Sequence, residues 1–235
     1  MKKVVYILFT VLCISCSQSS DAFLKRAREL MVEGKKKEAM EFLNKAIDKN
    51  TKNDEAFNLR GVAYFESRDF DNALLDYDKA IELNPQKYRP YFNRALLYVE
   101  QKKLNLALED YNKSITLVPD TADVYLNRGQ VLALMDSTDL AISDFKTAVR
   151  LDEKNVNAWY NLGNTLYKTS QYKEAVDALQ KTVRLDPRFT KGVFGLGLAQ
   201  WEAGEQELGC QNLREAARQG HEQAAMVAAH NCPTE

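Results

Sequence analysis

The 235-residue chain repeats one pattern of small and large side chains every 34 residues. Six consecutive frames start at residues 20, 54, 88, 122, 156 and 190, without a gap. The eighth position is always small: Ala27, Gly61, Ala95, Gly129, Gly163 and Gly197. So is the twentieth: Ala39, Ala73, Ala107, Ala141, Ala175 and Gly209. The twenty-fourth is large: Leu43, Tyr77, Tyr111, Phe145, Leu179 and Leu213. A single register of this kind indicates an array of similar structural units.

This spacing is typical of closely packed helices. An Ala or Gly allows two helix axes to approach, and a bulky residue of the partner helix fills the space opposite. Each frame therefore predicts a hairpin of two helices. Pro85, Pro119 and Pro187 stand at the thirty-second position, where Pro ends a helix because it lacks the backbone N–H. Glu153 and His221 replace this Pro, so those two boundaries are less sharply defined.

The segment Trp159 to Gly163, together with Ala175 and Pro187, resembles the tetratricopeptide repeat (TPR) family, and the resemblance covers residues 20–223. It implies an all-α fold, a right-handed superhelical solenoid of six hairpins, because a single hairpin cannot bury its own apolar face. The predicted repeats are 20–53, 54–87, 88–121, 122–155, 156–189 and 190–223. We expect a capping helix and tail at 224–235, since His221 to Asn231 is rich in Ala and precedes Pro233.

The first residues have the pattern of a secretory signal. Two Lys precede an apolar stretch from Val4 to Ile14, which is too short to span a bilayer. Ser15 and Cys16 follow, and the segment resembles the signal peptides of bacterial lipoproteins. The resemblance implies a signal peptide at 1–15, a diacylated Cys16, a tether at 16–19 and lasting anchorage in a membrane.

Two further residues bear on this interpretation. Cys13 stands where lipoprotein signals usually have Leu, and plain secretion with cleavage nearby is the alternative. Ser17 follows the lipidation site in place of the Asp that retains some lipoproteins in the inner membrane. By resemblance, we expect the bacterial cell envelope, with the outer membrane favoured over the inner membrane.

The seventh and twenty-third positions vary together. In the second to fourth frames they hold Arg and Asp, and in the fifth both are lost, to Leu162 and Ala178. We predict structural ion pairs within these hairpins, since an Arg without its carboxylate would be costly to bury. The predicted pairs are Arg60 with Asp76, Arg94 with Asp110, and Arg128 with Asp144. A row of Arg that binds an anionic ligand is the alternative.

In the TPR family the first helices line a concave face, which implies a partner-binding surface here. The predicted residues are Phe92, Asn93, Leu126, Asn127, Tyr160, Asn161, Asn164, Tyr167, Phe194 and Trp201. Asn93, Asn127 and Asn161 recur once per repeat, and an amide offers both a donor and an acceptor to the backbone of an extended peptide. Local hydrogen bonding of Asn, and packing of the aromatic residues between repeats, are equally open alternatives.

Four potential metal ligands gather near the C-terminus: Cys210, His221, His230 and Cys232. Their spacing matches no known zinc finger. In an oxidising envelope, a disulfide between Cys210 and Cys232 is the favoured alternative to zinc, and unpaired thiols remain a third. The bridge would hold the capping helix against the array.

The sequence contains no pattern typical of an enzyme. No nucleophile and base occur at a catalytic spacing, and no phosphate-binding loop is present, so we expect no catalytic residue, cofactor or metal. The formal net charge of −1 gives no basis for nucleic-acid binding. We expect a membrane-anchored adaptor that binds a protein or an extended peptide. The alternatives are a structural or self-associating subunit, or a regulatory subunit of an envelope enzyme or an outer-membrane assembly complex. The sequence does not define the oligomeric state.

Overall fold

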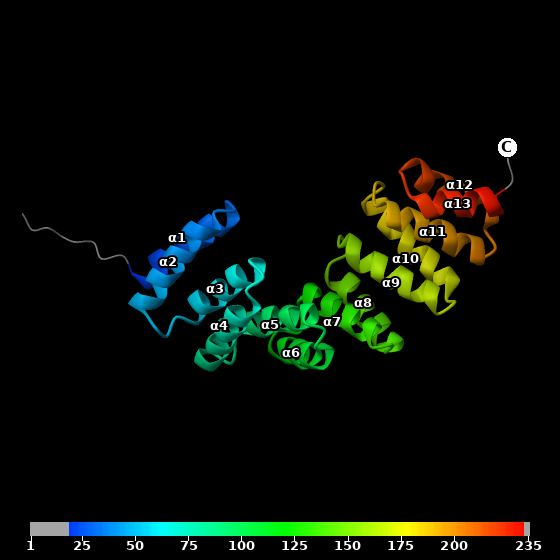
Figure 1. The fold of residues 1–235 in the computed structure, drawn as a ribbon. Coiled ribbons are helices and arrows are strands. Elements are labelled where there is room, and N and C mark those ends of the chain that lie inside the picture. The colour runs from blue at the N-terminus through cyan, green and yellow to red at the C-terminus, as the bar shows by residue number, and fades with distance from the viewer. Residues whose placement is uncertain (1–18, 233–235) are drawn as a thin grey trace, which may run out of the picture. The chain divides into compact units, whose positions relative to one another are not determined.

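A computed structural model describes residues 19–232 of the chain, which are helical apart from short turns (Figure 1). The thirteen helices of this part are α1 (Ser20–Val32), α2 (Lys36–Lys49), α3 (Asp54–Glu66), α4 (Phe70–Leu83), α5 (Tyr88–Glu100), α6 (Leu104–Leu117), α7 (Ala122–Leu134), α8 (Thr138–Leu151), α9 (Val156–Lys168), α10 (Tyr172–Leu185), α11 (Thr190–Glu202), α12 (Gln206–Arg218) and α13 (Glu222–Asn231). The predicted all-α class is confirmed.

The odd-numbered helices from α1 to α11 begin at the first residue of each 34-residue frame. Each packs most extensively on the next helix of the chain, which gives six consecutive hairpins. α13 follows the last hairpin and packs on α12. It begins at Glu222, two residues before the expected cap, because Nδ1 of His221 accepts a 3.2 Å hydrogen bond from the Ala224 N–H and so caps the helix.

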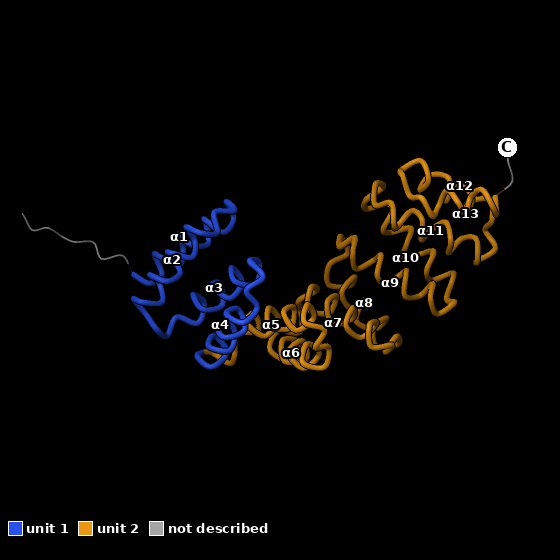
Figure 2. Tube along the Cα trace, viewed as in Figure 1, with its two compact units in different colours: residues 1–83 blue, residues 84–235 orange. Residues whose placement is uncertain are grey.

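The chain forms two compact units, residues 1–83 and 84–235 (Figure 2). The described part of the first unit holds α1 to α4, around a core that includes Leu24, Leu43 and Ala56. The second unit holds α5 to α13, and its largest apolar cluster lies among α7 to α11 and includes Phe145, Leu162 and Leu179. Each unit is a stack of hairpins that share buried side chains.

The recurring small residues meet the recurring large ones inside each hairpin. A Cβ built on Gly129 would lie 2.7 Å from Cε1 of Phe145, and a Cβ on Gly163 would lie 2.6 Å from Cγ of Leu179. Real Cβ atoms do not approach this closely, so the partner side chain occupies the space that the missing Cβ leaves free. The alternation of positions eight and twenty-four therefore reports direct contact between the two helices.

All six hairpins have the same turn between their helices. The fifteenth residue of each frame has a positive φ: Gly34, Arg68, Lys102, Asp136, Ser170 and Gly204. In the second hairpin, the Arg68 N–H donates to the Phe65 carbonyl, and the Asp69 N–H donates to the Tyr64 carbonyl, each at 2.9 Å. This Schellman arrangement satisfies the last carbonyls of the first helix and reverses the chain. Four of the six turns achieve it without Gly.

Candidate functional site

The residues predicted for partner binding lie on the first helices of four hairpins, all in the second unit. Phe92 and Asn93 lie on α5, Leu126 and Asn127 on α7, Tyr160, Asn161, Asn164 and Tyr167 on α9, and Phe194 and Trp201 on α11. Nine of the ten are partly exposed. Leu126 is only 8% exposed and belongs to the apolar core, so its side chain serves packing between hairpins.

Two of these residues line a hollow of about 480 Å³. Tyr160 and Asn161 form part of its wall with Asn157 of α9 and Gln130 of α7. The rest comes from the α10–α11 turn and the start of α11: Asp186, Arg188, Phe189, Thr190 and Lys191. The surface is mixed, with amide groups, two aromatic rings, two cations and one carboxylate. Such a surface can bind a peptide backbone and one or two side chains.

Local contacts fix the walls of this hollow. The Tyr160 ring meets the Phe189 ring edge to face, with centroids 5.1 Å apart. Burial raises the pKa of the Tyr160 hydroxyl, which therefore stays protonated and can donate a hydrogen bond. The Arg188 backbone N–H donates a 2.9 Å hydrogen bond to Oδ1 of Asp186, which shapes the turn. The hollow is thus built from an ordered helix face and an ordered turn.

Two of the recurring Asn residues, Asn127 and Asn161, make local hydrogen bonds. Nδ2 of Asn127 donates to the Asp123 carbonyl at 2.7 Å, and Nδ2 of Asn161 donates to the Asn157 carbonyl at 2.8 Å. Each side-chain amide donates one N–H to the carbonyl four residues earlier in its own helix. Within residues 19–232, a second N–H and the amide oxygen of each remain for an external partner, because Asn has two donors and an acceptor. Local bonding and peptide binding are therefore compatible.

The other predicted aromatic residues lie against neighbouring helices. Phe92 packs on Tyr111 with ring centroids 5.9 Å apart, and Phe194 stacks on His221 at 4.2 Å. Tyr167 lies 5.7 Å from Tyr172. Trp201 packs against the apolar cluster at the C-terminus. These residues, together with Asn93, Asn127 and Asn164, do not line the hollow.

Several residues of the hollow were absent from the sequence-based set. Gln130, Asn157 and Lys191 hold the ninth and second positions of their frames, which also point inward in TPR proteins, so the frame could have identified them. Asp186, Arg188, Phe189 and Thr190 come from the turn and the adjoining end of α11. Asp186 holds the thirty-first position, where the side chains of Asn50, Asn84 and Asp152 accept the same backbone hydrogen bond. No recurring feature of the frame marks Arg188 and Phe189.

The three Arg–Asp pairs are present within their hairpins. Nε and Nη2 of Arg60 each donate a 2.8 Å hydrogen bond to Asp76, and Arg94 binds Asp110 at the same distances. The three carboxylates are 6–7% exposed, whereas the Arg side chains are 20–21% exposed. A fork of two charge-assisted bonds occupies each guanidinium, so these Arg residues contribute to hairpin structure rather than to a ligand site.

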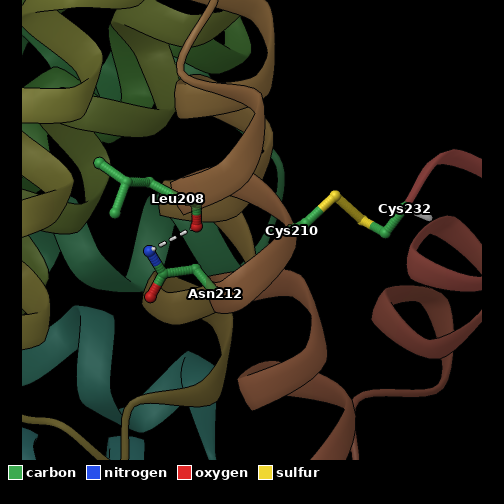
Figure 3. Close-up of a disulfide and its surroundings, with 4 residues drawn as sticks. All are labelled: Leu208, Cys210, Asn212 and Cys232. Atoms are coloured by element: carbon green, nitrogen blue, oxygen red, sulfur yellow. Dashed lines mark hydrogen bonds between the residues drawn. A yellow bond between two sulfur atoms is a disulfide. The ribbon is translucent and has the colours of Figure 1, made fainter. Parts of the chain in front are cut away.

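A disulfide joins Cys210 of α12 to Cys232 after α13 (Figure 3). Both sulfur atoms are thus withdrawn from metal binding, and His221 caps α13 instead. Within residues 19–232, no group of three or more His, Cys, Asp or Glu side chains could hold a metal ion. Cys16 lies outside the described residues. None of the helices described here is long and apolar enough to cross a membrane.

Comparison with protein families gives an independent assignment. Models described as tetratricopeptide repeat match residues 54–87 and 156–189 and residues 76–109, and a TPR repeat model matches 95–136 and 137–170. Together these matches span residues 54–189, more than half of the chain. The chain belongs to the tetratricopeptide repeat family. The first two matches coincide with two of the 34-residue frames, and none of the matching models describes a catalytic family.

Solved structures show the same fold. PilF of Pseudomonas aeruginosa superimposes with a TM-score of 0.80 at 18% identity, covering 90% of this chain and 97% of its own. YrrB, described as a TPR protein with an unusual peptide-binding site, gives 0.71 at 21% identity, covering 80% and 97%. MamA gives 0.64 at 23% identity, covering 70% and 96%. Comparison with curated protein sequences gives no significant match.

Proposed function

We propose that this chain is a membrane-anchored TPR lipoprotein of the bacterial cell envelope, which binds an extended peptide or protein partner on the first helices of its second unit. The hollow at Tyr160 and Asn161 carries the proposal, because it combines amide groups, aromatic rings and charges on consecutive hairpins. The peptide-binding site of the similar protein YrrB supports the same kind of ligand. The matching family models favour a binding scaffold over an enzyme.

The peptide would lie across α7, α9 and the start of α11. The free N–H and amide oxygen of Asn161, with the amide of Gln130, can pair with its backbone. Tyr160 and Phe189 would contact an apolar side chain, and Arg188 and Lys191 would favour a carboxylate nearby. Binding to the backbone gives affinity, and these side chains give specificity.

A pull-down from native membranes tests whether the hollow at Tyr160 and Asn161, called the groove below, binds the partner. The test variant is Gln130→Ala/Asn161→Ala/Lys191→Ala in the full chain, and its control is Asn105→Ala/Glu109→Ala/Lys146→Ala, which changes exposed residues of α6 and α8. We expect the test variant to lose partners that the control retains. Equal recovery by the two proteins would contradict the groove. Light scattering of the purified protein would then show whether it associates with itself instead.

Lipid attachment is tested separately. Cells fed an alkyne-bearing fatty acid should label the wild-type chain and not Cys16→Ser, and fractionation should place the labelled protein in the outer membrane. Labelling of Cys16→Ser would contradict attachment at this residue. Release of the unlabelled wild-type chain as a free protein would instead support plain secretion. The motivation is the sequence of residues 1–16, which combines two Lys, an apolar core and a small residue before Cys.

A further inference from the structure

A second hollow lies at the junction of the fourth and fifth hairpins, with a volume of about 630 Å³. Its walls come from the end of α8, the α8–α9 turn, the start of α9 and the end of α10. The lining residues are Val149, Arg150, Glu153, Lys154, Trp159, Lys181, Arg184 and Leu185. None of them lines the hollow at Tyr160. The two sites are therefore formed by different residues, and this one is built mainly from second helices.

The charge of this hollow is strongly one-sided. Arg150, Lys154, Lys181 and Arg184 are all exposed, and within residues 19–232 none of the four forms an ion pair. Glu153 is the single carboxylate among the lining residues. Four cations and one carboxylate give the lining a net positive charge, which favours a bound anion.

The repeats themselves provide an internal control. Arg150 and Arg184 hold the twenty-ninth position of their frames, where the first two frames have Asp48 and Glu82. The hairpin therefore does not require a cation at this position. The last frame also has an Arg here, Arg218, but this Arg pairs with Glu215. Among the described residues, the Arg side chains of this position that form no ion pair are those of the fourth and fifth frames, and both line the hollow.

Three apolar side chains also line the hollow: Val149, Trp159 and Leu185. Trp159 is the only Trp at the fourth position of any frame, and Nε1 of its ring donates a 2.9 Å hydrogen bond to the Glu153 carbonyl. Val149 stands where the first three frames have Ile, which leaves more room. Leu185 is 39% exposed. Cations and the apolar side chains of Trp159 and Leu185 line the same hollow, which matches a ligand that combines an apolar group with negative charges.

We infer that this hollow is a second binding site, for an acidic segment of a partner protein that places one large apolar side chain between Asp or Glu residues. Inorganic phosphate would pair with the cations and leave Trp159 and Leu185 uncovered. A membrane surface is flat, whereas the hollow can enclose a side chain. The site does not depend on the proposed groove, and the scaffold could therefore hold two segments at once.

The test measures binding of a set of synthetic peptides to the full chain in detergent. Each peptide carries one Leu, Phe or Trp flanked by Asp or Glu, and matched peptides carry Lys in place of the acids. The test variant is Arg150→Glu/Arg184→Glu. The control, Lys146→Glu/Lys173→Glu, changes the net charge equally at exposed residues of the same two helices, away from the hollow.

We expect acidic peptides to bind the wild type and the control about equally, and to lose about tenfold or more in affinity for the test variant, with strong dependence on salt. Circular dichroism establishes that both variants are folded. Failure of every acidic peptide to bind, or equal affinity of the two variants, would overturn the inference. So would binding of phosphate or of phosphatidylglycerol vesicles in preference to the peptides. The variant Gln130→Ala/Asn161→Ala/Lys191→Ala should retain acidic-peptide binding, which separates this site from the groove.

Discussion

The guanidinium of Arg128 and the carboxylate of Asp144 form two parallel hydrogen bonds of 2.7 Å between α7 and α8. Nη1 of Arg128 also donates to Oδ1 of Asn112 on α6 at 2.8 Å, so one side chain links two successive hairpins. In the next hairpin, Leu162 and Ala178 occupy the corresponding positions and are 4% and 3% exposed. The same backbone geometry thus accepts either a complete ion pair or a complete apolar pair.

Removing one partner of this pair should be more harmful than removing both. Asp144→Ala leaves a partly buried cation without its carboxylate, and we expect it to lower the free energy of unfolding by about 3 kcal/mol. Arg128→Leu/Asp144→Ala reproduces the fifth repeat and should lie within about 1 kcal/mol of the wild type. Urea denaturation measures both. A double variant as unstable as Asp144→Ala would contradict the claim that an apolar pair can replace the ion pair.

Tyr111 carries a hydroxyl that has no hydrogen-bond partner among the described residues and is buried. Burial also raises the pKa of this hydroxyl well above its ordinary value. Phe145 holds the same position one hairpin later, where it is 1% exposed. We therefore expect Tyr111→Phe to raise the free energy of unfolding by about 1 kcal/mol, because an unsatisfied buried group is removed. Thermal denaturation would show a lower midpoint if the hydroxyl were bonded.

Gly209 lies in the closest approach of two helices in the last hairpin. A Cβ on this residue would lie 2.9 Å from the Gly197 carbonyl oxygen and 2.9 Å from the Trp201 nitrogen, both backbone atoms. Gly209→Ala must push α11 and α12 apart, and we expect a loss of about 1–3 kcal/mol. Gly195→Ala is the control, since its Cβ would meet only the Leu179 side chain, at 3.3 Å. Comparable losses in the two variants would exclude helix separation as the cause.

The disulfide closes a loop of 22 residues that contains the whole of α13. α13 packs chiefly on α12, so the bridge should set its local stability. The chain-entropy model gives about 3 kcal/mol for a loop of this length. In Cys210→Ser/Cys232→Ser we expect much faster hydrogen exchange in α13 and little change in α5 and α6. Unchanged protection of α13 would show that packing alone holds the cap.

The sequence was sufficient to predict the fold because its main signals are local and repeated. Positions eight and twenty-four lie sixteen residues apart and are in contact across the hairpin. The Arg and Asp of positions seven and twenty-three have the same separation, so alignment of the frames predicts both contacts. The hairpin turn gave no such signal, since Arg68, Lys102, Asp136 and Ser170 share a left-handed backbone but no chemistry.

The candidate site was harder to predict from the sequence. The frame placed Tyr160 and Asn161 on the face of the hollow, but Arg188 and Phe189 reach it from the α10–α11 turn. No other frame has Arg at position thirty-three or Phe at position thirty-four. Leu126 shows the opposite error, because an inward position in the family pattern is occupied here by a core residue. Exposure depends on the neighbouring hairpin, which the frame does not encode.

Photo-crosslinking in the native membrane tests the partner-binding surface most directly. A photoreactive amino acid is placed at Tyr160, in the hollow of the first helices, or at Lys146, on the exposed side of α8. We predict that the chain modified at Tyr160 forms a crosslink to a specific protein and that the chain modified at Lys146 does not. A crosslink to the same protein from Lys146, with none from Tyr160, would contradict the account.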